Sequence, residues 1–278
     1  MLTINLKLLS FLDNTPATMV HKPYICGSMR NVLFQFLLAL IFCCSGYGQS
    51  IRDTAKFRTQ LSISYAIQLP EGDLKQRFGW NSNLGLFLDF KLKSNWVIGL
   101  NSQFIFGNQI KDTSMLNDML TSDGQIINQN GNYARVQAYQ RGWNFSGNFG
   151  RVFSVIGPNP NSGILVKLGI GFMQHKVRID AEQNLVPQFT GDYKKLYDRY
   201  TNGISFTQFL GYSHMSSSRL ANFFGGFEFT QGITKGRRER QAGGPTDLQD
   251  DRIDLLMGIR VGWIVPLYKR APRDFYLD

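Results

Sequence analysis

The segment from Arg252 to Tyr268 constrains the fold most, because apolar residues alternate there with polar or small ones. Its apolar face consists of Ile253, Leu255, Met257, Ile259, Val261, Trp263 and Val265. Its other face holds the charged residues and glycines Arg252, Asp254, Gly258, Arg260 and Gly262. Leu256 and Ile264 are the two apolar residues on that face. Successive side chains of a strand point to opposite faces, so the pattern predicts a strand with one apolar face. A run of about a dozen residues exceeds a typical soluble strand and matches a tilted strand that crosses a bilayer.

Similar alternation recurs along the chain. It appears in segments 57–69, 84–92, 96–107, 139–150, 164–172, 204–212 and 223–230. The connections alternate between short links (93–95, 154–162, 214–220) and long polar ones (70–81, 108–132, 176–203, 232–251). An even strand count, short turns at one end, long loops at the other and aromatic residues near both ends are typical of outer-membrane barrels. The sequence therefore predicts an all-β, eight-stranded antiparallel up-and-down transmembrane β-barrel. The alternative is a soluble lipocalin-like barrel, whose apolar face points inward.

The front of the chain has the layout of a secretory signal. Arg30 follows Met29, an apolar run extends from Val32 to Cys44, and small residues precede a cut near Gly48. A helical membrane anchor is the alternative, but the run is shorter than the roughly 20 residues that a spanning helix needs. Lipid attachment at Cys43 or Cys44 is a second alternative. We expect residues 1–28 to be an upstream segment, 29–48 a signal peptide, 49–56 a periplasmic lead, 57–268 the barrel and 269–278 a periplasmic tail.

Composition narrows the class of partner. All three cysteines (Cys26, Cys43 and Cys44) precede the expected cut, so disulfides, zinc–thiolate sites and a catalytic cysteine are not expected after it. Removing Lys7, Lys22 and Arg30 together with Asp13 lowers the formal net charge from +10 to +8. In an exported chain this charge favours outer-membrane lipid, lipopolysaccharide or an envelope protein over nucleic acid. We expect no cofactor and no metal, and a location in the outer membrane of a Gram-negative bacterium with both termini in the periplasm.

The inward face is predicted to carry a charge network. Its members are Asp89, Lys91, Lys167, Glu228, Arg252, Asp254 and Arg260. An eight-stranded barrel is only wide enough for side chains to fill, and buried charges must be paired. We therefore expect a structural polar plug, with a narrow small-solute pore as the alternative.

A short segment resembles an enzyme site. His214, Ser216 and Glu228 are similar in spacing to the catalytic residues of outer-membrane lipid A 3-O-deacylases. The resemblance covers about fifteen residues, and His214 and Ser216 fall in a predicted periplasmic turn rather than in the outer leaflet. We expect a non-enzymatic protein, and a lipid A-type acyl hydrolase using His214 and Ser216 remains the alternative.

Three segments form a candidate binding surface. Tyr and Arg are favoured at protein interfaces, and Arg also suits phosphate groups. The candidate residues are Tyr193, Tyr197 and Arg199 in one long loop, Arg237, Arg238 and Arg240 in the last loop, and Arg270, Phe275 and Tyr276 in the tail. A merely solvated basic face is the alternative for the last loop.

The chain from Gln49 onward resembles the small outer-membrane β-barrels of Bacteroidota. The resemblance rests on Gln49 itself, on Tyr197-Asp198-Arg199, on Thr201-Asn202-Gly203 and on the closing segment from Gly262 to Tyr268. Several such barrels are accessory subunits of envelope machines, including the type IX secretion and gliding apparatus. The resemblance implies a non-enzymatic anchor, scaffold or accessory subunit of a cell-envelope assembly.

Overall fold

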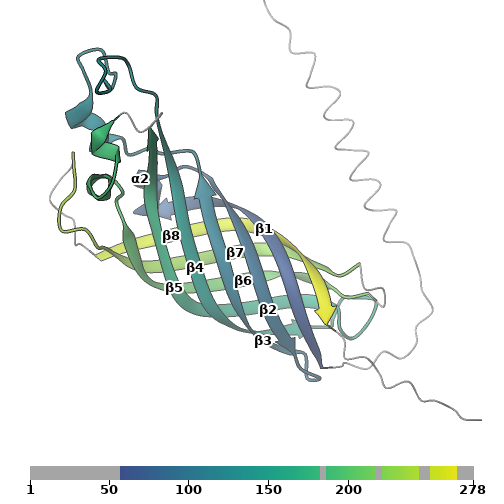
Figure 1. Cartoon of the computed structure of the whole chain (residues 1–278). Helices are drawn as coiled ribbons and strands as arrows, with labels where there is room; N and C mark the ends of the chain where they lie inside the picture. The colour runs from purple at the N-terminus through teal and green to yellow at the C-terminus, as the bar shows by residue number, and fades with distance from the viewer. Residues whose placement is uncertain (1–56, 182–185, 217–220, 244–250, 268–278) are drawn as a thin grey trace, which may run out of the picture. The chain divides into compact units, whose positions relative to one another are not determined.

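The computed structural model describes residues 57–181, 186–216, 221–243 and 251–267. Within these ranges eight strands close into one barrel (Figure 1). They are β1 (Arg58–Gly72), β2 (Asn81–Lys91), β3 (Trp96–Gly107), β4 (Val136–Phe153), β5 (Gly163–Ala181), β6 (Thr201–His214), β7 (Phe223–Gly236) and β8 (Asp251–Leu267). Every strand is antiparallel to both neighbours, and β1 pairs with β2 and β8, which closes the ring. The predicted eight-stranded up-and-down barrel is confirmed.

The two faces of the barrel have inverted polarity relative to a soluble barrel. Outward side chains are large and apolar, and Ile63, Leu100 and Phe227 are 53%, 64% and 69% exposed. Inward side chains such as Ser62 and Gln103 are polar and buried. Exposing this much apolar surface to water is unfavourable, whereas hydrocarbon accepts it. The outer surface is therefore built to face lipid, which excludes the lipocalin-like alternative.

The two ends of the barrel differ. The end with the links 92–95, 154–162 and 215–222 is called here the turn end, and the opposite end the loop end. Among the described residues, four short helical segments belong to the loop end (Figure 1). They are α2 (Leu74–Arg77), η1 (Ser114–Met119), η3 (Pro187–Phe189) and η4 (Tyr193–Leu196). No helix in the described ranges is long and apolar enough to cross a membrane.

The strands extend further toward the loop end than the sequence pattern predicts. β5 continues to Ala181 and β7 to Gly236, although the long loops were expected to begin at residues 176 and 232. Pairing of Val136 with Ala181 keeps the ladder intact beyond the apolar band. Along 176–181 the apolar face of Val177, Ile179 and Ala181 packs into the apolar cluster of the loop end, so side-chain packing and backbone pairing together sustain the strand there.

Two apolar clusters fill the ends of the interior. The cluster nearer the turn end contains Phe87, Val97, Val152, Leu165, Phe209, Met215, Phe224 and Ile264. The cluster at the loop end contains Leu74, Phe78, Ile105, Met115, Ile126, Met173, Val177, Val186, Phe189, Tyr197 and Leu256. On β8, Arg260 lies between Ile264 of the first cluster and Leu256 of the second, so a polar layer separates them. The expected structural polar plug is therefore limited to this layer, and apolar packing closes both of its ends.

Candidate functional site

Arg260 is the centre of the polar layer. Its side chain is fully buried and donates from Nε to Oε2 of Glu228 at 2.6 Å and from Nη2 to Oε1 at 2.7 Å. It also donates to Ser64 Oγ at 2.7 Å and to Asn83 Oδ1 at 3.0 Å. Gln68 Nε2 adds a hydrogen bond to Glu228 Oε1 at 3.2 Å. This cluster joins β1, β2, β7 and β8 from the inside, and its paired, hydrogen-bonded charges satisfy the condition for burial.

A second ion pair crosses the barrel. Lys167 on β5 donates to Asp89 Oδ2 on β2 at 2.5 Å, although these strands are not neighbours in the ring. The Lys167 ammonium also lies 5.3 Å from the ring centroid of Phe87 and 5.9 Å from that of Phe224. A cavity of about 10 Å³ remains beside it, enough for about one water molecule. The polar layer thus fills the interior at this level.

A third cluster lies nearer the loop end. His175 Nε2 and Asp254 Oδ2 are 2.8 Å apart, and Thr234 Oγ1 donates to the same oxygen. Arg252 Nε lies 3.9 Å from the other Asp254 oxygen, and Phe78 contacts His175 edge-on with ring centroids 5.8 Å apart. His175 belongs to this network, although it is not among the network residues predicted from the sequence. His175 lies two residues after the inward Met173, and this spacing places both side chains on the inner face of β5.

The seven predicted network residues all lie on the inner face, but in separate groups. Asp89 pairs with Lys167, Glu228 with Arg260, and Arg252 approaches Asp254. Lys91 donates to the side-chain oxygens of Asn95 at 2.6 Å and Asn161 at 3.0 Å, and so holds the turn end. Among the described residues no group of three or more His, Cys, Asp or Glu side chains is placed to hold a metal ion.

The loops at the loop end fold into a compact layer. We call residues 73–80, 108–135, 186–200 and 237–243 the loop cap; Phe78, Met115 and Tyr197 from three of its loops share one apolar cluster. Arg77 reaches down from the cap and donates to Thr201 Oγ1 at 3.0 Å. Burial, with a further contribution from the charge of Arg252, lowers the pKa of Arg77 to about 10. A cap whose apolar residues pack on the barrel interior is held in one arrangement rather than left as independent loops.

Arg199 ties three loops of the cap together. Its Nη1 donates to Gln241 Oε1 at 2.6 Å, and its Nη2 donates to Ser114 Oγ at 3.0 Å and to the Gly243 carbonyl at 2.8 Å. Its Nε is 3.6 Å from Asp112 Oδ2. Arg199 has a φ of 48°, a left-handed conformation that non-glycine residues rarely adopt, so the surrounding contacts must hold it there.

Asp198 and Arg238 form a second tie between loops. Arg238 donates from Nε at 2.9 Å and from Nη2 at 2.5 Å to the two carboxylate oxygens of Asp198, and it lies over the Tyr200 ring at 5.2 Å. The hydrogen bond that Arg238 donates to the Asp198 carboxylate raises the pKa of Arg238 above its usual range. The Asp198 carbonyl accepts from the backbone N–H of Val177 at 2.7 Å, which anchors the tie to β5.

The predicted binding surface is corrected in part. Tyr197 and Arg199 are buried, at 8% and 5% exposure, because they build the cap instead of presenting themselves to a partner. Arg238 is occupied by Asp198, while Tyr193, Arg237 and Arg240 are exposed. Arg270, Phe275 and Tyr276 lie outside the described residues. Loop residues have no periodicity from which burial can be read, which explains the error.

The residues of the proposed hydrolase site are not brought together. His214 is the last residue of β6, where its ring stacks on Phe223 at 4.9 Å. Glu228 pairs with Phe209 in the β6–β7 register, five residues from His214, and its carboxylate binds Arg260. Five strand residues correspond to about 17 Å, beyond any hydrogen bond. The hydrolase therefore gains no geometric support from a triad and stays a prediction.

Comparisons with known proteins give structural likenesses only. No protein-family profile and no curated protein matches the chain. Among solved structures, Ail, the attachment invasion locus protein of Yersinia pestis, aligns at 9% identity with a TM-score of 0.36. The N-terminal β-barrel domain of Pseudomonas aeruginosa OprF aligns at 9% identity with a TM-score of 0.34. Both alignments cover 75% of this chain and 99% of the other, and at this level they carry no assignment of function.

Proposed function

We propose that the chain is an integral outer-membrane β-barrel that acts as a non-enzymatic anchor or scaffold for a cell-envelope assembly. The observation that carries this proposal is a filled barrel that bears a folded loop cap. A filled interior leaves no path for solutes, and a cap packed on that interior offers a rigid docking surface.

The placement in the membrane follows from the outer face. Large apolar side chains cover it, whereas charges lie inside or at the ends. Thr59 near the start of β1 pairs with Leu267 at the end of β8, so the chain enters and leaves the barrel at the turn end. Short turns of outer-membrane barrels face the periplasm, which would put both termini there and the loop cap outside the cell.

Preorganisation supports a docking role for the cap. Ordering flexible loops on binding costs free energy, and a prefolded surface avoids most of that cost. Tyr133 and Tyr193 are 67% and 68% exposed, and Arg237 and Arg240 are exposed on another loop of the cap. Exposed Tyr and Arg are enriched at protein interfaces. The partner class that fits is an envelope protein, with lipopolysaccharide phosphates as a further ligand of the two arginines.

An accessory role in type IX secretion or gliding is the finer form of this proposal. It rests on the resemblance to Bacteroidota barrels.

The docking role is tested by a pull-down of the tagged barrel from mildly solubilised outer membranes. We expect a stoichiometric envelope protein to copurify with the unchanged chain and to be lost from a Tyr193→Ala/Arg240→Ala variant. A Lys93→Ala variant, altered at an exposed position of the turn end, is the matched control and should retain the partner. Recovery of the barrel alone from native membranes would contradict the scaffold proposal.

The pore alternative makes the opposite prediction in planar bilayers. We expect the purified barrel to be electrically silent, because the Lys167–Asp89 and Arg260–Glu228 pairs fill the interior. A conducting porin in the same bilayer serves as the positive control. Reproducible ion-conducting steps from the barrel would support the pore and count against a filled interior.

A further inference from the structure

Two carboxamides interrupt the apolar outer face of β6 and β7. Gln208 is exposed in the middle of β6, between the outward Phe206 and Leu210. Gln231 on β7 pairs with Phe206, and Gln208 pairs with Phe229, so the two glutamines are diagonal neighbours on one face. Neither side chain has a hydrogen-bond partner within the ranges that the structure describes. In a lipid-facing position such groups are unfavourable, since hydrocarbon offers no hydrogen bond.

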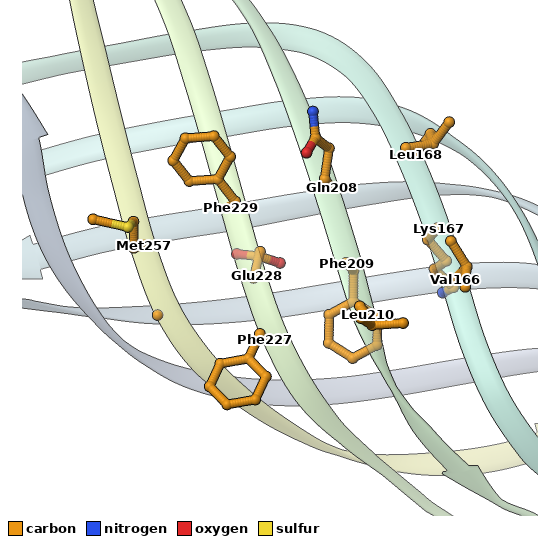
Figure 2. Close-up of a pocket in the computed structure, with 11 residues that line it drawn as sticks. Val166, Lys167, Leu168, Gln208, Phe209, Leu210, Phe227, Glu228, Phe229 and Met257 are labelled. Carbon is orange, nitrogen blue, oxygen red and sulfur yellow. The ribbon is translucent and has the colours of Figure 1, made fainter.

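Gln208 lies in a groove on this face. The groove has a volume of about 440 Å³, and its outward lining includes Leu168, Leu210, Phe227, Phe229 and Met257. Figure 2 shows the Gln208 amide between Leu168 on one side and the Phe227 and Phe229 rings on the other. The two rings are part of the lining of the groove. A lipid acyl chain would fill such a groove but leave the amide without a partner.

The chemistry of the face favours one occupant. In a two-fold contact each residue of the patch meets the same patch on the other copy, so the patch must be self-complementary. A carboxamide meets this condition because it carries both donors and an acceptor. Gln208 and Gln231 are uncharged, so the polar groups of two copies meet without like-charge repulsion.

We propose that this face of β6 and β7 is the contact surface of a dimer of the chain in the membrane, in which the Gln208 carboxamides of the two copies hydrogen-bond to each other. The proposal goes beyond the docking role of the loop cap. It rests on the membrane placement proposed above and does not depend on the scaffold role.

Cross-linking in lipid vesicles tests the dimer. The only cysteines are Cys26, Cys43 and Cys44, so replacing them with serine in the full-length chain leaves a background for single reporters. Leu210→Cys, next to Gln208 on the same face and 57% exposed, is expected to form a dimer with a short bis-maleimide. Leu86→Cys, 50% exposed on β2 four strands away, is the matched control and should stay monomeric at the same protein-to-lipid ratio.

Removal of the amide provides the decisive comparison. Adding Gln208→Leu to the Leu210→Cys chain is expected to lower the cross-linked fraction about three- to tenfold, the range for one interchain polar contact in a membrane. Because Gln208 faces lipid, the Gln208→Leu variant should still fold. Heat-dependent gel mobility checks that the variant barrel is folded. The dimer proposal would be overturned if both reporters cross-linked equally, if neither did, or if the products contained other proteins only. It would also be overturned if Gln208→Leu had no effect on the cross-linked fraction.

Vesicle flotation distinguishes a failure of the dimer proposal from a failure of the membrane placement. A barrel that floats with the vesicles and remains monomeric contradicts the dimer alone. A barrel that does not float contradicts the membrane placement, and the dimer proposal falls with it.

Discussion

Replacing Arg260 with methionine is expected to destabilise the barrel by about 3–5 kcal/mol, the cost of leaving one member of a buried ion pair alone. The guanidinium makes both hydrogen bonds to the Glu228 carboxylate from a fully buried position. Without it, the Gln68 amide is the one hydrogen-bond partner left to the carboxylate among the residues that the structure describes. The free energy of unfolding, measured by urea titration in lipid vesicles with tryptophan fluorescence, gives the size of the effect.

Two controls isolate the charge effect. Arg260→Met combined with Glu228→Gln removes both charges and is expected to recover most of the lost stability. Arg178→Ala breaks an exposed ion pair with Asp180, whose side chains are 57% and 46% exposed, and should change stability by less than about 1 kcal/mol. An Arg260→Met barrel that is as stable as the unchanged chain would refute the role of this pair.

Replacing Arg199 with alanine is expected to open the loop cap while the barrel stays folded. The side chain makes three hydrogen bonds to two other loops, and loss of such charge-assisted bonds costs about 3 kcal/mol in local stability. Hydrogen exchange of segments 112–116 and 237–243 should therefore accelerate roughly 100-fold, since about 1.4 kcal/mol corresponds to a factor of ten. Exchange in the strands should not change.

The controls for Arg199 separate the side chain from the backbone. Arg199→Gly tolerates the φ of 48° and should still open the cap, because the guanidinium is lost. Arg199→Lys keeps the charge but lacks the planar fork and is expected to restore little protection. Arg240→Ala, at an exposed position of the same cap, should have no effect on exchange. Unchanged protection in Arg199→Ala would mean that the apolar cluster alone holds the cap.

The face on which each strand residue lies could be predicted from the sequence. The period of two placed Asp254 and Arg260 inside and Trp263 outside, as found, because a strand has no other way to arrange its side chains. The face of a residue was harder to predict where a polar residue occupies the outer face and an apolar residue the inner face. Phe209 follows Gln208, and only the structure shows that Phe209 packs inward against Phe224 while Gln208 faces out.

By itself, the sequence determined the class of the barrel, the inner and outer face of its strands and the end at which the long loops lie, since these follow from local alternation and turn spacing. The tertiary structure decided which charges meet, such as Lys167 with Asp89 across the interior and His175 with Asp254. It also decided that Tyr197 and Arg199 are buried in the loop cap. The physical reason is that these contacts depend on the closure and stagger of the ring and on loop packing, which join residues far apart in the chain and leave no periodic trace in it.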